Sequence, residues 1–189
     1  MNREQDVAWN EFPTWEPPNK HPIDRTQPKP DLTYAFPILK KGSEPLKGFE
    51  RDEFTRCFSL EILGELRKNN ILSAPTTGLN RWLKDPDTRL WSKDYSCFPW
   101  AVVEMKRDDE TMERCYCQAA NAAAAAVTLH AQLLEKISGD STSLVPPVIA
   151  FTTVGPNVKV WLAYQTSDIS GRQLQVGCAS PHFSLKTDR

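Results

Sequence analysis

The sequence has no long apolar run, no excess of charge of one sign, no glycine-rich loop and no even set of cysteines. No apolar run among the 189 residues approaches the ~20 that a membrane-spanning helix requires, so we expect a soluble protein without a membrane partner. Lys and Arg number 23 against 24 Asp and Glu, which argues against a strong overall basic field for nonspecific nucleic-acid binding. The eight glycines form no phosphate-binding loop, and neither a Gly-x-Ser-x-Gly elbow nor a kinase signature is present. These absences exclude the P-loop, α/β-hydrolase and protein-kinase classes.

The five cysteines are an odd number, and the first residues, Met1 to Asp6, contain no apolar signal segment. We therefore expect an intracellular protein, nuclear or cytoplasmic, with reduced thiols. Cys115 and Cys117 lie two positions apart in a predicted helix, where their sulfur atoms point about 200° apart. Because no histidine stands at ligand spacing either, we expect no structural zinc site.

The most informative segment is an apolar run that ends in a carboxylate and an amine, Phe98-Pro99-Trp100-Ala101-Val102-Val103-Glu104-Met105-Lys106. Side chains alternate across a strand, so Glu104 and Lys106 share one face with Val102 and Trp100. Burying a glutamate without a partner is costly. The end of this strand therefore predicts the mouth of a site rather than a solvated surface.

The remaining pattern predicts one α/β domain over residues 50–189, preceded by an arm over residues 1–49. The arm holds eight of the fifteen prolines and is expected to be extended or partly disordered. Segment 81–91 is either a short helix or irregular. Within the domain we expect helices over 50–69 and 110–137 and strands over 97–106, 147–153, 158–164 and 173–178, the second helix being rich in alanine.

Four sequence features together resemble the PD-(D/E)xK nuclease-like proteins of filamentous fungi, in the restriction-endonuclease-like superfamily. One is Asp94, nine intervening residues and then Glu104-x-Lys106. The others are the strings Phe98 to Glu104, Cys115-Tyr116-Cys117-Gln118-Ala119-Ala120-Asn121-Ala122-Ala123 and Val154 to Tyr164. The resemblance covers roughly residues 50 to 170. It implies a restriction-endonuclease-like core, in which helices flank a mixed central sheet.

The resemblance also implies a metal site of hard oxygen ligands, which favour Mg²⁺ or Mn²⁺. Its ligands would be Asp94, Glu104 and the backbone carbonyl of Met105, and Lys106 would act on the attacking water or on the charge that develops at phosphorus. Asp87 is the alternative first acid, because it follows a proline as the motif name requires. Asp94 is preferred, since its segment runs directly into the strand.

Three further residues are candidates by the same resemblance. Nucleases of this type often add a carboxylate from the first helix, where Glu61 and Glu65 lie four positions apart on one face. Either glutamate is otherwise a solvated helix residue. Gln118, early in the second helix, matches a glutamine that borders the site in several branches and would act catalytically by orienting water or a phosphate oxygen. Its alternative role is structural, at the contact between helix and sheet.

The implied function is a metal-dependent endonuclease or phosphodiesterase acting on DNA in preference to RNA. One alternative is a nuclease-fold protein with weak or absent catalysis that binds nucleic acid or protein, as the near-neutral charge allows. The other is a truncated relic. Members of the resembling family usually continue beyond the end of this sequence, so the chain is expected to be a short member, a truncated product or a fragment.

Overall fold

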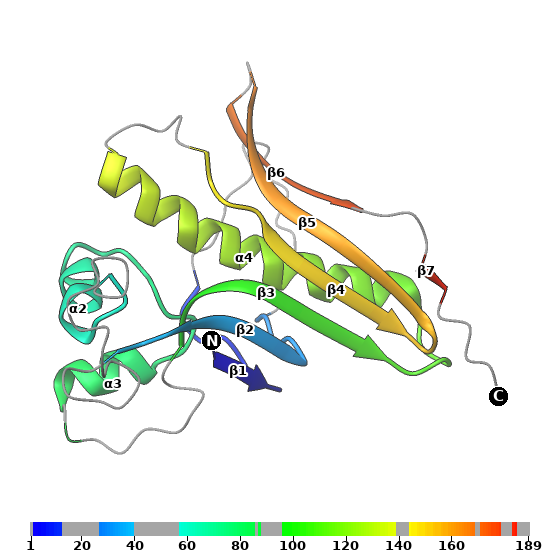
Figure 1. The fold of residues 1–189 in the computed structure, drawn as a ribbon, viewed down its shortest axis with the longest axis horizontal. Helices are drawn as coiled ribbons and strands as arrows, with labels where there is room; N and C mark the ends of the chain where they lie inside the picture. Colours follow the sequence, from blue (N-terminus) through cyan, green and yellow to red (C-terminus); the bar gives the residue numbers. More distant parts are fainter. Residues whose placement is uncertain are drawn as a thin grey trace.

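A computed structural model describes residues 2–12, 27–39, 57–85, 87, 96–138, 144–168, 171–178 and 183–184. Within these residues, seven strands form one sheet in the order β1-β2-β3-β4-β5-β6, and β7 pairs with β5 (Figure 1). Strands β3 and β4 are parallel and the other pairs are antiparallel, which confirms an α/β fold with a mixed sheet. The strands are β1 (Asn2–Gln5), β2 (Leu32–Pro37), β3 (Ser96–Lys106), β4 (Val148–Val154), β5 (Asn157–Asp168), β6 (Gly171–Cys178) and β7 (Phe183–Ser184).

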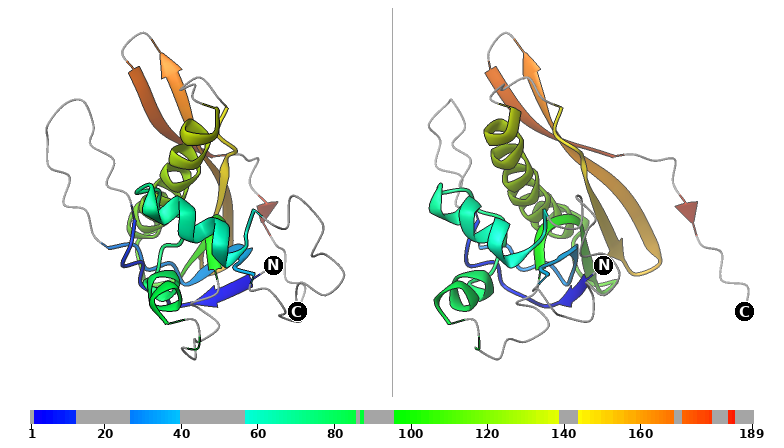
Figure 2. Two further views of the ribbon diagram at one scale, coloured as in Figure 1. Left: turned by 90° about the vertical axis from the view of Figure 1, so that its left-hand side faces the viewer. Right: turned by 60° about the vertical axis from the view of Figure 1, so that its left-hand side comes forward.

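Helix α4 (Met112–Ser138) connects β3 to β4 and packs along the sheet (Figure 2). Small side chains line its buried face, so the helix axis can approach the strands closely. Ala119, Ala122 and Ala126 are almost fully buried in one cluster with Val102 and Ala150. The predicted alanine-rich helix, the strand before it and the hairpin after it are thus confirmed, with bounds shifted by a few residues.

Helices α2 (Leu60–Lys68) and α3 (Gly78–Lys84) pack beside the start of β3, in a cluster that includes Cys97 and Phe98. The helix expected from residue 50 instead begins at Leu60, capped by Ser59, whose Oγ accepts a 3.4 Å hydrogen bond from the N–H of Ile62. Residues 50–56 of the expected helix lie outside the described part. Just before the helix, the Leu39 N–H donates to the Phe58 carbonyl at 2.9 Å. Leu39 and Ser59 form a β-bridge there, so the chain before Leu60 is not helical.

The described parts of residues 1–49 belong to the folded core, in contrast to the expected arm. Strand β1 pairs with β2, and β2 pairs with β3. The Trp9 side chain is fully buried in the cluster beneath α4, and the backbone N–H of Trp9 donates to the Pro28 carbonyl at 2.8 Å. The sequence did not indicate these strands, because proline is frequent in this segment and the partners that hold β2 in place lie far away in the sequence.

The two faces of the sheet differ in how deeply their side chains are buried. The face toward α4 holds fully buried side chains such as Val148 and Ala163. On the opposite face, Ile149, Phe151 and Leu162 alternate with them and are half-buried. None of the helices in the described ranges has the length and apolar character needed to cross a membrane.

Candidate active site at the end of strand β3

Glu104 and Lys106 lie near the carboxyl end of β3, on the side of the sheet that α4 covers. Glu104 is only 1% exposed, and the Lys106 Nζ lies 3.6 Å from its Oε2. Alternation places Val102, which packs under α4, on the same face. The predicted sharing of one strand face is therefore confirmed, and the pair is a buried ion pair rather than a surface one.

Asp31, which the sequence analysis did not single out, stands across from Glu104 on the neighbouring chain segment. It directly precedes β2, where Thr33 is the cross-strand partner of Val102, so two further steps bring Asp31 opposite Glu104. Its Oδ2 accepts a 2.5 Å hydrogen bond from the Met105 N–H, 74 positions away in sequence. One signal was present in the sequence, since Asp31 follows Pro30 and precedes an apolar alternating run.

Glu104 has a strongly perturbed acidity. Its pKa is raised to about 7, chiefly by burial and next by the negative charge of Asp31, while the Lys106 ammonium acts in the opposite direction. Desolvation and a second carboxylate both favour the neutral acid. The repulsion between two carboxylates held together in this way is removed when one of them takes up a proton or when a cation binds.

The end of β3 is held by contacts to α4 and to the β4–β5 turn. The Cys115 thiol on α4 contacts the Glu104 carbonyl at 3.6 Å and the Thr153 carbonyl at 3.8 Å. The Gly155 N–H donates to the Lys106 carbonyl at 3.2 Å, and Gly155 has a left-handed φ of 54° that suits glycine. Backbone position at the site is thus fixed from two neighbouring elements.

Aromatic side chains and a lysine adjoin the site on the β5 side. Thr152 is the cross-strand partner of both Glu104 and Lys159. The Lys159 Nζ lies 4.9 Å from the centroid of the Tyr116 ring, which packs against Trp161 at 4.8 Å. The indole N–H of Trp161 donates to the Thr152 Oγ1 at 2.8 Å. A second cation is therefore held two strands from Glu104.

Gln118 lies on α4 one helical turn beyond Cys115. Tyr116 points toward β5, and residues two positions apart on a helix point about 200° apart, so Gln118 points toward the β2 side. Its Oε1 is buried and has no hydrogen-bond partner within the residues that the structure describes. The sequence named Gln118 as a candidate, and an unpaired buried amide oxygen is the feature that a ligand or water would satisfy.

Of the other predicted acids, the three that the structure describes are not brought together with Glu104. Asp94 lies outside the described residues. Asp87 is exposed and follows α3, and its N–H donates to the Asp85 side chain. Glu61 and Glu65 are exposed on α2. Both helices pack beside the start of β3 (Figure 1). Phe98 belongs to that cluster and lies six positions, about 20 Å, along the strand from Glu104. Glu61 and Glu65 thus lie away from Glu104, and the metal ligand expected on the first helix stays a prediction.

Comparison with protein-family models, curated proteins and solved structures found no match. The site must therefore be interpreted from its own geometry. Within the described ranges, no three His, Cys, Asp or Glu side chains gather as a metal cluster. Among the described residues, the site offers two carboxylates, Asp31 and Glu104, together with backbone oxygens.

Proposed function

We propose that this protein is a metal-dependent nuclease that hydrolyses phosphodiester bonds, with a restriction-endonuclease-like core and its site at the end of β3. The observation that supports this most is the meeting of Asp31, Glu104 and Lys106, two carboxylates and an amine from separate segments. In this proposal Asp31 takes the role of the first acid, which the family resemblance assigns to Asp94. The preference for DNA over RNA rests on the resemblance to restriction endonucleases.

The donor set fits Mg²⁺ or Mn²⁺. Mg²⁺ is commonly held by one or two carboxylates and completes its shell with water and substrate phosphate, so a third acidic side chain is not required. The N–H and C=O of a paired strand residue lie on the same edge. The Met105 N–H points to Asp31, so its carbonyl lies on that edge too and would be the third protein ligand. When bound, the metal supplies Lewis-acid polarisation of a phosphoryl oxygen.

Lys106 and Gln118 supply the groups that the metal does not. The Lys106 ammonium, largely buried beside Glu104, places a positive charge where negative charge develops on the phosphate. The buried Gln118 amide can accept a hydrogen bond from water or donate one to a phosphate oxygen. Lys159, which packs on Tyr116, would contact the neighbouring phosphate.

A second candidate function is nucleic-acid or protein binding without turnover. The net charge of −1 favours its protein-binding form, because a chain without an excess of cations has no overall field that attracts nucleic acid. The two candidates share a fold but differ in what Lys106 does. A binding protein keeps its affinity when Lys106 loses its charge, whereas a nuclease loses turnover.

The test is cleavage of single- and double-stranded DNA and RNA in Mg²⁺ and in Mn²⁺. We expect Asp31→Asn, Glu104→Gln and Lys106→Met each to lower the rate by about 10²–10⁴-fold, the range for removing one electrostatic or acid–base group. Asp94→Asn should retain the wild-type rate, because Asp31 is proposed as the first acid.

Glu61→Gln is the matched control, since it removes an exposed carboxylate far from Glu104. Folding of every variant is matched by circular dichroism. Absence of cleavage by the wild type in both metals, with nucleic-acid binding retained, supports the second candidate. Loss of cleavage in Asp94→Asn but not in Asp31→Asn contradicts the assignment of Asp31.

A further inference from the structure

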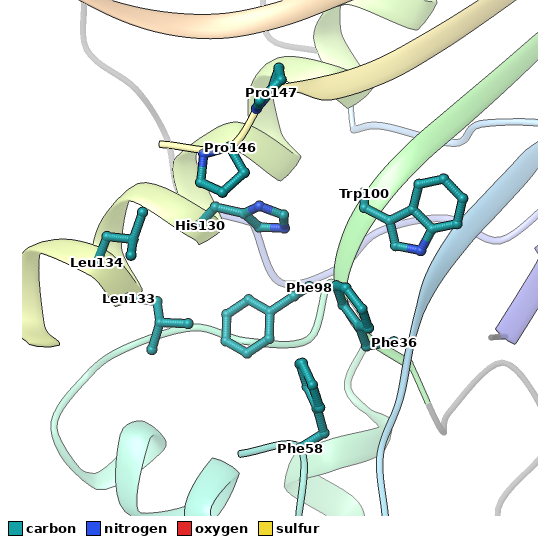
Figure 3. A pocket seen from close by; sticks show the side chains of 9 residues that line it. All are labelled: Phe36, Phe58, Phe98, Trp100, His130, Leu133, Leu134, Pro146 and Pro147. Carbon is teal, nitrogen blue, oxygen red and sulfur yellow. The ribbon is translucent and has the colours of Figure 1, made fainter. Parts of the chain in front are cut away.

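A cavity of about 240 Å³ lies at the opposite end of β3 from Glu104 (Figure 3). It is bounded by the first residues of β3, the C-terminal half of α4 and the segment that leads into β4. The side chains that line it are mostly apolar, and most of them carry a ring. They include Phe36, Phe58, Phe98, Trp100, Pro146 and Pro147. Phe36 stacks on Phe58 with ring centroids 4.6 Å apart, so these two lining rings support each other.

One polar side chain enters this apolar lining. His130 on α4 is 9% exposed, and its imidazole hydrogen-bonds to the backbone at Phe98 and Pro99. Its Nε2 has no hydrogen-bond partner in the described residues, so Nδ1 makes the backbone contact. Figure 3 shows the ring among the lining side chains, between Pro146 and Phe98. A buried nitrogen without a partner is a cost that a ligand can remove.

The protonation of His130 decides what the nitrogen can bind. Burial lowers the pKa of His130, so the ring is neutral near pH 7. A neutral imidazole that donates from Nδ1 presents a lone pair at Nε2. The only polar feature that His130 offers to the cavity is therefore a hydrogen-bond acceptor.

The backbone at the rim is held in an unusual conformation. Phe98 has a φ of 45°, in the left-handed region that a bulky side chain rarely adopts. The Phe98 N–H donates to the Ser73 carbonyl at 2.7 Å, and the Phe98 and His130 rings meet edge to face at 5.9 Å. Such strain persists where the surroundings enforce it, often at ligand-binding positions. Here it sets the ring of Phe98 in the cavity wall.

We infer that this cavity binds a small bicyclic aromatic molecule that carries one N–H donor, with the ring between the aromatic walls and the donor on His130 Nε2. An apolar cavity of about 150 Å³ accommodates benzene, so the larger volume here suits two fused rings. Apolar walls with one placed polar group are typical of small-molecule sites. The site is independent of the proposed nuclease function, because Phe98 lies about 20 Å along the strand from Glu104.

The test compares indole with benzofuran, which has the same fused shape but no N–H donor. Each is titrated into ¹⁵N-labelled full-length protein. We expect indole to shift the amide resonances of Phe98, Trp100 and residues 130–134 saturably, and to bind about tenfold more tightly than benzofuran through the extra hydrogen bond. Equal affinities contradict the role of Nε2. Absence of saturable shifts up to the solubility limit of indole, or shifts confined to residues around Glu104, overturns the site.

Two variants separate the acceptor from the cavity. His130→Phe keeps a ring in place but removes the acceptor, so indole should lose its advantage over benzofuran. Leu133→Trp fills the cavity, which Leu133 lines, so both ligands should lose affinity by tenfold or more. Unchanged indole binding in Leu133→Trp overturns the assignment. If His130→Phe does not fold, the wild-type comparison and Leu133→Trp still decide it.

Discussion

The Asp31 carboxylate accepts a 2.5 Å hydrogen bond from the backbone N–H of Met105, and this contact sets Asp31 beside the buried Glu104. The hydrogen bond orients one carboxyl group without neutralising it. Glu104 is buried and lies next to the negative charge of Asp31, and both the burial and the charge raise the pKa of Glu104. The arrangement costs stability in the free protein and is favourable once a cation or proton is present.

Glu104→Gln should stabilise the metal-free protein at high pH. The folded-state pKa of about 7 lies above the ordinary value of 4.5, so stability from protonated Glu104 is present below pH 4.5 and is lost as the pH rises through 7. The amide that Glu104→Gln introduces carries no charge at any of these pH values, so the variant does not lose this stability as the pH rises. We expect a gain on the order of 3 kcal/mol in the free energy of unfolding at pH 8 and little gain at pH 5, from about 1.4 kcal/mol per unit.

Urea denaturation with a chelator present, at pH 5 and pH 8, measures this difference. Glu61→Gln serves as the control, since that carboxylate is exposed. A Glu104→Gln protein that is equally stable or less stable than the wild type at pH 8 contradicts the proposed cost of the buried charge.

Mg²⁺ should raise the melting temperature more at pH 8 than at pH 6. The cation must displace the proton that Glu104 holds at the lower pH, so binding releases a proton and strengthens as pH rises. Asp31→Asn should reduce the shift at both pH values. Thermal melts over a Mg²⁺ titration measure it, and an equal shift in Asp31→Asn and wild type shows that Asp31 is not a ligand.

Trp9→Ala should destabilise the fold by about 3–5 kcal/mol, the range for truncating a buried large aromatic. Trp9 is fully buried beneath α4, although it lies in a proline-rich segment. Chemical denaturation measures the loss. Leu144→Ala, at a position 88% exposed, is the apolar control and should change stability little. Matching stabilities for the two variants refute the placement of Trp9.

Ala126→Leu should cost about 1–3 kcal/mol, because added methyl groups have no room between α4 and the sheet. Ala126 is fully buried in the cluster with Val102. Ala124→Leu, at a half-buried position of the same helix, should be better tolerated. Thermal denaturation of the pair measures this, and equal losses argue against the close approach of α4.

Local sequence determined β3, α4 and the hairpin of β4 and β5. Alternation over Phe98 to Lys106 placed Glu104 and Lys106 on one face, and alanine spacing over residues 112–138 defined a helix that packs closely. These features depend on neighbours a few residues apart, so periodicity predicts them. The start of α2 was wrong because a bridge between Leu39 and Ser59, not local propensity, decides where that helix begins.

Only the tertiary structure decided the partner of Glu104. Asp31 reaches the site because β2 pairs antiparallel with β3. This pairing brings Asp31 to Met105, 74 positions away, and no local pattern encodes the contact. The same pairing placed β1 and Trp9 in the core despite the prolines around them. The raised pKa of Glu104 and the unpaired Nε2 of His130 likewise arise from burial, which depends on what the whole chain packs around each group. Sequence determined which ionisable side chains share one face of β3, and long-range packing decided which groups they meet.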